Sequence, residues 1–120
     1  MDYLKSNPKT LKERDIVKQC KMFLEFHGWR AIRMQRTVVS GQFQCGEPGI
    51  PDFLFLKYRT IQHPDIMWIE FKSKAGKLSD KQAEWHFKER IRGATIWVVD
   101  DFDVFRQQYE ENYGQTFGKG

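Results

Sequence analysis

The segment from Ile66 to Ser73 constrains the fold most strongly, because its side chains alternate between two chemical kinds. In an extended strand, successive side chains point to opposite faces of the sheet. One face then carries three consecutive apolar side chains, those of Met67, Ile69 and Phe71. The other face carries a mixed set, namely Trp68, Glu70 and Lys72. This pattern favours a central strand of a sheet, with a carboxylate and an ammonium sharing one small patch.

The rest of the chain supplies helices and shorter strands around this segment. Asn7 to Thr10 is expected to open the first helix and Gly28 to end it. The order α-β-β-β-α-β-α predicts a mixed α/β fold, with one sheet and helices packed against it. The loop from Ser40 to Pro51 contains three glycines and two prolines. The other expected elements are strands at Trp29 to Val39, Asp52 to Leu56 and Ala94 to Val99, and helices at about Asp80 to Arg92 and Asp101 to Tyr113.

Hydrophobic periodicity assigns a core-facing side to two of these helices. In the first helix, the residues on one face are Ile16, Val17, Cys20, Phe23, Leu24 and His27. In the helix that starts near residue 80, the apolar residues that recur every four positions are Ala83, Phe87 and Ile91, with Trp85 off that line. These two sets predict which side of each helix meets the sheet.

The composition of the 120 residues predicts one domain at 1–113 and a flexible tail at 114–120. Hydrophobic residues make up 40% of the chain and aromatic residues 15%, which is enough for one packed core. No apolar run approaches the ~18 to 20 residues that cross a bilayer, and no apolar leader begins the chain. We therefore expect no membrane partner and a cytoplasmic location. The net charge of +4 permits an anionic partner, and Cys20 and Cys45 are too few for a disulfide scaffold.

Two acids on neighbouring strands are the main candidates for chemistry. Asp52 follows Gly49-Ile50-Pro51 and begins an apolar strand, where an acid is disfavoured. With Glu70 it supplies hard oxygen ligands of the kind that Mg²⁺ or Mn²⁺ takes together with waters and a substrate phosphate. Lys72, beside them, could orient or deprotonate an attacking water. The structural alternatives are a turn residue at Asp52 and a surface ion pair between Glu70 and Lys72.

Glu13 and Gln82 each allow a structural and a functional interpretation. Glu13 lies at the centre of the core-facing stripe of the first helix, where an unpaired charge is costly. It either forms a capping box with Thr10 or contacts a metal-bound water in a pocket beside the core. Gln82 forms a capping box with Ser79, or its side chain hydrogen-bonds a phosphate or the attacking water.

The histidines and basic residues give weaker indications. We expect His27 to be a core residue at a helix end and His63 and His86 to be surface residues, and none of them has metal-ligand spacing. The basic residues near the proposed site are Lys72, Lys74, Lys77 and Lys81, and those on the strand before the glycine loop are Arg30, Arg33 and Arg36. A solvated face is the usual explanation of such charges. Placed around acids, they also suit a polyanion that approaches through a metal.

Taken in order, four sequence motifs resemble those of the VRR-Nuc branch of the PD-(D/E)xK nuclease superfamily. They are Glu13, then Gly49-Ile50-Pro51-Asp52, then Ile69-Glu70-Phe71-Lys72, then Leu78-Ser79-x-x-Gln82-x-x-Trp85. The resemblance runs from about Glu13 to Val99 and implies a restriction-endonuclease-like core. It implies that the metal ligands are Asp52, Glu70 and the Phe71 carbonyl, with Glu13 assisting through water. It further implies that Lys72 is the catalytic lysine and that Gln82 is the polar residue that supports it.

The same resemblance implies a function. Stand-alone members of this branch occur in phages and bacteria, which implies a bacterial or phage-infected host cell. They are similar to Holliday-junction resolvases, which are homodimers that nick symmetry-related strands of a four-way junction. We therefore expect a Mg²⁺- or Mn²⁺-dependent endonuclease that is selective for branched DNA and acts as a homodimer. One alternative is an exonuclease or restriction-type enzyme that cuts duplex DNA with the same core. The other is a DNA-binding module in which Glu70 and Lys72 form only an ion pair.

Overall fold

The computed structural model describes residues 8–34, 38–39, 42–43, 47–59 and 63–114. Its elements are α2 (Pro8–Phe26), β1 (Arg30–Arg33), β2 (Val38–Val39), β3 (Gln42–Phe43), β4 (Phe53–Lys57), β5 (Asp65–Phe71), α3 (Asp80–Ile91), β6 (Ile96–Val99), α4 (Phe102–Tyr109) and a π-helical segment, η1 (Glu110–Gly114). The main sheet has the order β1-β4-β5-β6, in which the first two pairings are antiparallel and the last is parallel. This arrangement confirms the predicted mixed α/β class.

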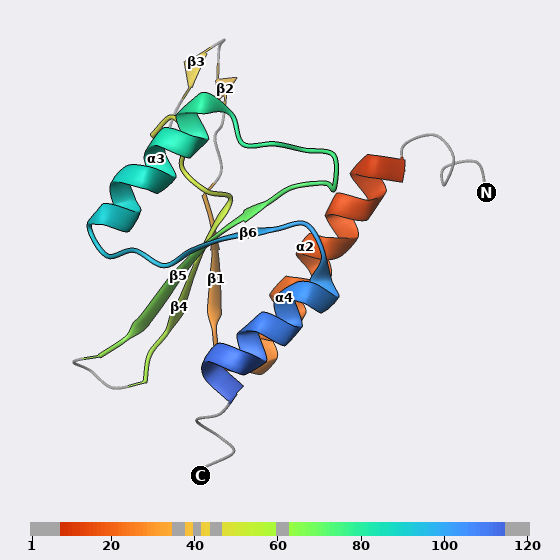
Figure 1. The fold of residues 1–120 in the computed structure, drawn as a ribbon, viewed down its shortest axis with the longest axis vertical. Helices are drawn as coiled ribbons and strands as arrows, with labels where there is room; N and C mark the ends of the chain where they lie inside the picture. The colour runs from red at the N-terminus through yellow and green to blue at the C-terminus, as the bar shows by residue number, and fades with distance from the viewer. Residues whose placement is uncertain (1–7, 35–37, 40–41, 44–46, 60–62, 115–120) are drawn as a thin grey trace.

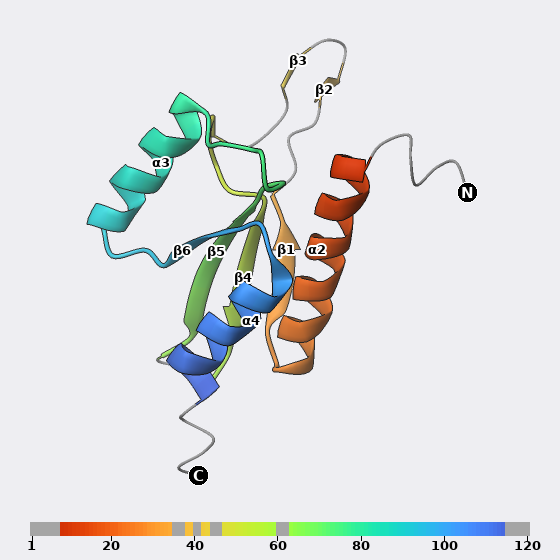
Figure 2. The same cartoon turned by 45° about the vertical axis from the view of Figure 1, so that its right-hand side comes forward.

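Helices cover both faces of the main sheet (Figure 1). The turned view shows α2 and α4 together on one face and α3 on the other (Figure 2). Strands β2 and β3 pair with each other as a separate antiparallel ribbon beyond the end of the main sheet. Strand β5 lies between β4 and β6, so it is the central strand that its alternating sequence predicts.

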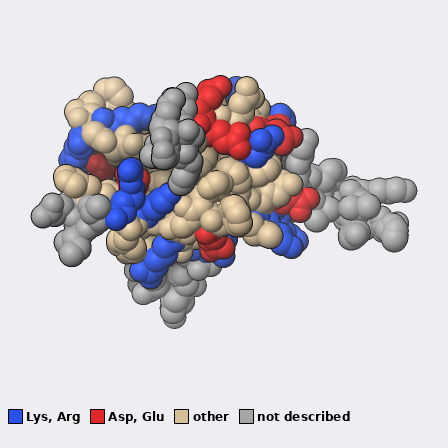
Figure 3. All heavy atoms as spheres, turned by 90° about the horizontal axis from the view of Figure 1, so that it is seen from below, with Lys and Arg blue, Asp and Glu red and all other residues tan. Residues whose placement is uncertain are grey.

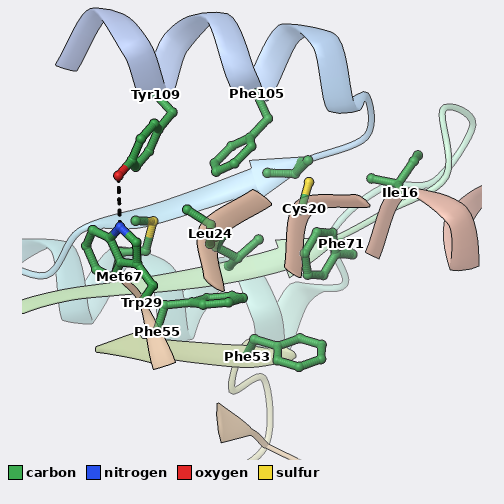
Figure 4. Close-up of a cluster of buried hydrophobic side chains, with 12 residues drawn as sticks. Ile16, Cys20, Leu24, Trp29, Phe53, Phe55, Met67, Phe71, Phe105 and Tyr109 are labelled. Atoms are coloured by element: carbon green, nitrogen blue, oxygen red, sulfur yellow. Dashed lines mark hydrogen bonds between the residues drawn. The ribbon is translucent and has the colours of Figure 1, made fainter. Parts of the chain in front are cut away.

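The hydrophobic core lies between the main sheet and the pair α2 and α4 (Figure 4). Its largest fully buried apolar side chains are Tyr109, Phe55, Phe71, Phe105, Leu24, Met67 and Ile69. At one end of this core, Trp29 Nε1 donates a hydrogen bond of 2.9 Å to the Tyr109 hydroxyl. Cys20 is also buried here, and burial, with a smaller contribution from Asp101, raises the pKa of its thiol to about 12. Cys20 is therefore an inert core residue, as predicted.

The structure corrects two predictions, one about the start of α2 and one about the strand that follows it. Helix α2 begins at Pro8, so Thr10 lies inside the helix and cannot be the N-cap partner of Glu13. The strand predicted to run from Trp29 to Val39 is divided between β1 and β2, and the predicted loop after it contains β3. The register explains the division, because Arg33 pairs with Phe53, the first residue of β4. Beyond residue 34, the chain has therefore passed the start of its partner strand.

Helix α3 meets the sheet with a different side from the one that its apolar residues predict. Phe87 is 66% exposed and Ile91 is 70% exposed, and Ala83 is exposed as well. The buried residue of this helix is His86, and Gln82 and Trp85 are partly buried beside it. The physical reason is that the sheet face under α3 carries a carboxylate, so polar side chains are better partners there than apolar ones.

Three further predictions concern the ends and the surface of the molecule. Gly114 belongs to η1 rather than to a tail, whereas residues 115–120 lie outside the described residues. No helix in the described part of the chain is long and apolar enough to span a bilayer. On the face seen from below, basic and acidic side chains occur in several interspersed groups, without one continuous basic surface among the described residues (Figure 3).

Candidate active site

Glu70 is the centre of the polar layer between β5 and α3. Its side chain is buried, with only 1% of the residue exposed. Carboxylate oxygen Oε2 accepts a hydrogen bond of 3.1 Å from Gln82 Nε2. The other oxygen, Oε1, lies 3.7 Å from His86 Nε2. Because a buried carboxylate is costly unless polar groups surround it, Glu70 is a strong candidate for a functional residue rather than half of a surface ion pair.

Gln82 forms the capping box that its sequence allows and also contacts Glu70, whereas its hydrogen bond to a phosphate or to the attacking water stays a prediction. Its Oε1 accepts a hydrogen bond of 2.9 Å from the backbone N–H of Ser79, and its own backbone N–H donates to Ser79 Oγ at 3.1 Å. This is a complete capping box at the start of α3. The same side-chain amide donates through Nε2 to Glu70, so capping orients the amide toward the carboxylate. The two roles are therefore combined in one side chain.

Asp52 lies at the start of β4, directly before the pairing of Phe53 with Ile69. Its Oδ2 accepts a hydrogen bond of 2.9 Å from the backbone N–H of Phe71. Its backbone carbonyl also accepts a hydrogen bond of 2.8 Å from the N–H of Met34, which anchors this residue to the end of β1. The Asp52 carboxylate thus contacts the peptide that joins Glu70 to Phe71. The structure brings together two acids that are separated by 18 positions in the sequence.

Gly49 brings the segment that ends in Asp52 against the first turn of α3. It has a positive φ of 89°, and a Cβ at this position would collide with the carbonyl group of Lys81. Only glycine permits both this conformation and this close approach. A second contact supports the packing, since Trp85 Nε1 donates a hydrogen bond of 2.8 Å to the Glu47 carboxylate. The glycine motif therefore places Asp52 relative to the helix that carries Gln82.

Lys72 directly follows β5, which ends at Phe71, and its backbone N–H donates a hydrogen bond of 3.0 Å to the carbonyl of Val99. It is partly buried, and its aliphatic stem lies near the turn at Gly76, where an added Cβ would be 3.5 Å from Lys72 Cδ. Its ammonium charge is close enough to lower the pKa of the His86 imidazole. Lys72 therefore lies near the polar layer around Glu70, which is what a catalytic lysine at this position requires.

His86 is the site residue that the sequence interpretation missed. It was predicted to lie on the surface, but only 1% of it is exposed. Burial lowers the pKa of its imidazole, and the nearby charges of Arg90 and Lys72 lower this pKa further. The signal that could have identified it is its spacing from Gln82, because residues four apart lie on the same face of a helix.

The structure does not bring Glu13 into a cluster of acids. Among the described residues there is no group of three or more His, Cys, Asp or Glu side chains that could hold a metal ion. Glu13 is partly buried on α2, and the site it was predicted to join therefore consists of two carboxylates, Asp52 and Glu70, beside the backbone of Phe71. The assistance of Glu13 through a water remains a prediction.

The predicted basic residues have several different environments. Lys74 is exposed and forms an ion pair of 3.1 Å with Asp101. The Arg33 guanidinium lies 5.3 Å from the centroid of the Phe53 ring, which is a cation–π distance. Lys77 and Lys81 are exposed. Arg36 and Cys45 lie outside the described residues.

Comparisons with known proteins place this geometry in context. The chain matches the sequence profile of the VRR-NUC domain over residues 10–98. A solved structure described as a VRR_NUC domain matches with a TM-score of 0.61 and 26% sequence identity, covering 85% of this chain and 97% of that one. A search of curated proteins gave no match. The matched segment contains every residue of the polar layer around Glu70.

Proposed function

Because the chain belongs to the VRR-NUC family, and so is a nuclease-type DNA-processing domain, we propose that it is a metal-dependent endonuclease selective for branched DNA. One observation carries the proposal. The carboxylate of Asp52 accepts a hydrogen bond from the Phe71 N–H, in the peptide that joins Glu70 to Phe71. The carboxylate of Glu70 accepts a hydrogen bond from the side-chain amide of Gln82. Asp52, directly before β4, thus contacts the peptide that follows Glu70 on β5, and Lys72 comes next in the sequence.

The donor set fits Mg²⁺ or Mn²⁺. Asp52, Glu70 and the Phe71 carbonyl would supply only oxygen ligands, which these hard cations prefer. Mg²⁺ in phosphate-handling sites usually takes one or two carboxylates and completes its shell with waters and substrate oxygens. A pair of carboxylates without a third acid is therefore sufficient. When bound, the metal would neutralise charge on the phosphodiester and lower the pKa of a bound water.

The protein residues around this pair would then perform distinct tasks. The Phe71 N–H holds Oδ2 of Asp52, which leaves the other oxygen of that carboxylate to face the metal. Gln82 Nε2 donates to Glu70 Oε2, and each oxygen of that carboxylate keeps a further lone pair with which it could bind the cation. Lys72 would orient the attacking water and stabilise negative charge that develops on the phosphate. Glu13, on the helix across the sheet, would assist only through a water.

Substrate preference and assembly form the finer part of the proposal. Ligands that hold a phosphate do not read bases, so the shape of the DNA backbone would determine selectivity more than its sequence. A four-way junction has two equivalent cutting positions, which a homodimer would match with two sites. We therefore propose a homodimer that nicks Holliday junctions. The competing functions are a nuclease acting on linear duplex DNA and a non-catalytic DNA-binding module.

The test is a cleavage panel with linear duplex, flap and four-way DNA, each with Mg²⁺, Mn²⁺ or a chelator. We expect metal-dependent nicking of the four-way substrate, which Asp52→Ala and Lys72→Ala abolish while circular dichroism shows a folded protein. The matched control is Asp103→Asn, since the side chain of Asp103 is exposed on α4 and away from the polar layer. Cleavage that survives both site variants would contradict the assignment of Asp52 and Lys72 to the active site. No metal-dependent cleavage of any substrate by wild type would contradict the nuclease proposal, and equal cleavage of all three substrates would contradict the preference for branches.

A further inference from the structure

We propose that His86 is a positioning residue that holds the carboxylate of Glu70 in its metal-binding orientation, an inference that rests on the proposed metal site. This histidine is not part of the four sequence motifs that resemble those of the VRR-Nuc branch. Its position in the structure suggests the role. His86 lies on α3 one turn after Gln82, and the two side chains approach different oxygens of the same carboxylate.

Gln82 and His86 approach the Glu70 carboxylate to different distances. Gln82 Nε2 is 3.1 Å from Oε2 of Glu70, which is a hydrogen bond. His86 Nε2 is 3.7 Å from Oε1, which is slightly too long for one. Hydrogen bonds at catalytic sites are often long until the substrate binds, and they shorten in the loaded complex. A small rotation of either side chain would bring Nε2–H into bonding distance of Oε1.

His86 is buried with both ring nitrogens unsatisfied. Neither nitrogen has a hydrogen-bond partner among the described residues, although only 1% of the residue is exposed. An apolar side chain of similar size would fill the same space without the cost of burying two polar nitrogens. Buried polar groups of this kind call for a functional reason, and the nearby carboxylate of Glu70 provides one.

Two surfaces of the molecule offer weaker inferences. A cavity of about 360 Å³ between α2 and α4 contains several aspartates, but Asp101 there already caps α4 and pairs with Lys74. A groove of about 410 Å³ beside α3 contains Lys88 and Arg92, each of which pairs with a glutamate of the same helix. Among the described residues that line them, neither surface contains a buried polar side chain that would select a ligand. In contrast, His86 and Glu70 are both buried polar side chains.

The experiment measures the Mn²⁺ affinity of the 120-residue chain by calorimetry, together with thermal unfolding in chelator. His86→Leu removes both ring nitrogens but keeps an apolar side chain in the space. His86→Gln places an amide N–H close to the position of Nε2. We expect His86→Leu to weaken Mn²⁺ binding by roughly 10- to 100-fold, as is usual when a partner of a metal ligand is lost, and His86→Gln to restore most of it. In chelator, His86→Leu is expected to unfold at the same temperature as wild type or higher.

The controls separate this inference from the proposed metal site. Phe87→Leu, at the neighbouring exposed position of α3, should leave Mn²⁺ affinity unchanged. If wild type binds Mn²⁺, Glu70→Gln abolishes binding and His86→Leu has wild-type affinity, the positioning role is wrong while the metal site stands. If wild type and Glu70→Gln both fail to bind, the metal site itself is wrong, and the inference falls with it. Should His86→Leu not fold, a His86→Gln variant that folds but binds ten-fold more weakly than wild type would also overturn the role.

Discussion

The two faces of the main sheet differ in chemical character along the same strand, β5, since one face is apolar and the other is polar. On one face, Met67, Ile69 and Phe71 of β5 meet the aromatic core under α2 and α4. On the other, Glu70 meets Gln82 and His86 of α3. The first face gains stability from apolar burial, at about 1.5 to 3 kcal/mol for each large side chain. The second face bears the cost of burying a carboxylate, so it contributes little stability, and it contains the residues of the proposed active site.

This contrast teaches that stability and activity are separable in this chain. Changes on the core face should unfold the protein, and changes on the polar face should inactivate it while leaving it folded. The following predictions test that separation, beginning with the largest expected effect.

Glu70→Gln is expected to reduce cleavage of branched DNA by at least about 1,000-fold, because it removes a carboxylate from the metal site. The free energy of unfolding in chelator should be unchanged or higher, because replacing a buried charge with a neutral group removes a desolvation cost. Single-turnover kinetics and chemical denaturation measure the two quantities. A large loss of stability with near-normal cleavage would reverse the proposed roles of the two faces.

Phe55→Ala on the core face should lower the free energy of unfolding by about 3 to 5 kcal/mol, because it leaves a cavity beside Phe53. The matched control is Phe87→Ala on α3, where the ring is exposed, and its effect should be within about 0.5 kcal/mol. Urea denaturation of both variants checks the difference. Equal losses of unfolding free energy would mean that α3 packs against the sheet with the apolar side that contains Phe87.

Gly49→Ala should destabilise the protein by about 1 to 3 kcal/mol and reduce cleavage, because the methyl group strains the backbone and collides with Lys81. Gly93→Ala is the control, since Gly93 also has a positive φ but an added Cβ there meets no atom within 4 Å. Only Gly49→Ala should affect cleavage. An equal effect on activity from both variants would show that backbone strain, rather than the contact with α3, is responsible.

Gln82→Met should destabilise the protein by about 1 kcal/mol and also reduce cleavage by roughly 10- to 100-fold. The control is Ser79→Ala, which removes the hydroxyl that caps α3 but keeps the amide that contacts Glu70. It should cost similar stability and little activity. If both variants lose activity equally, Gln82 acts only through the capping box.

Trp29→Phe is expected to have the smallest effect, a loss of about 0.5 to 1.5 kcal/mol of stability with unchanged cleavage, because it removes one hydrogen bond to Tyr109. Combining it with Tyr109→Phe in a double-mutant cycle measures the coupling. A change in cleavage would show that the two faces of the sheet communicate.

The same contrast explains how much of this molecule can be predicted from its sequence. The alternation around Glu70 predicted the central strand and both of its faces, because period-two patterning reports directly on a strand. The motif containing Gln82 predicted both the helix start and a polar residue at the site. Hydrophobic periodicity predicted the wrong side of α3, because periodicity identifies the apolar side of a helix. Helix α3 packs against the sheet with its polar side.

Other features depend on contacts that no local pattern encodes. The division of the strand after Arg33 follows from where β4 begins, which is a property of the register between β1 and β4. The burial of His86 follows from its packing over Glu70, which lies 16 positions earlier in the sequence. The convergence of Asp52 on β5 was predicted, but the atom that it contacts, the Phe71 amide, was not.

The shared amide of Gln82 has a consequence for inactivation by heat. Because one side chain both closes the first turn of α3 and grips Glu70, fraying of that turn releases the carboxylate in the same event. Helix ends open with far less free energy than a packed aromatic interior. Catalytic competence would therefore disappear in a sub-global opening, at temperatures where hydrogen exchange still reports a protected core.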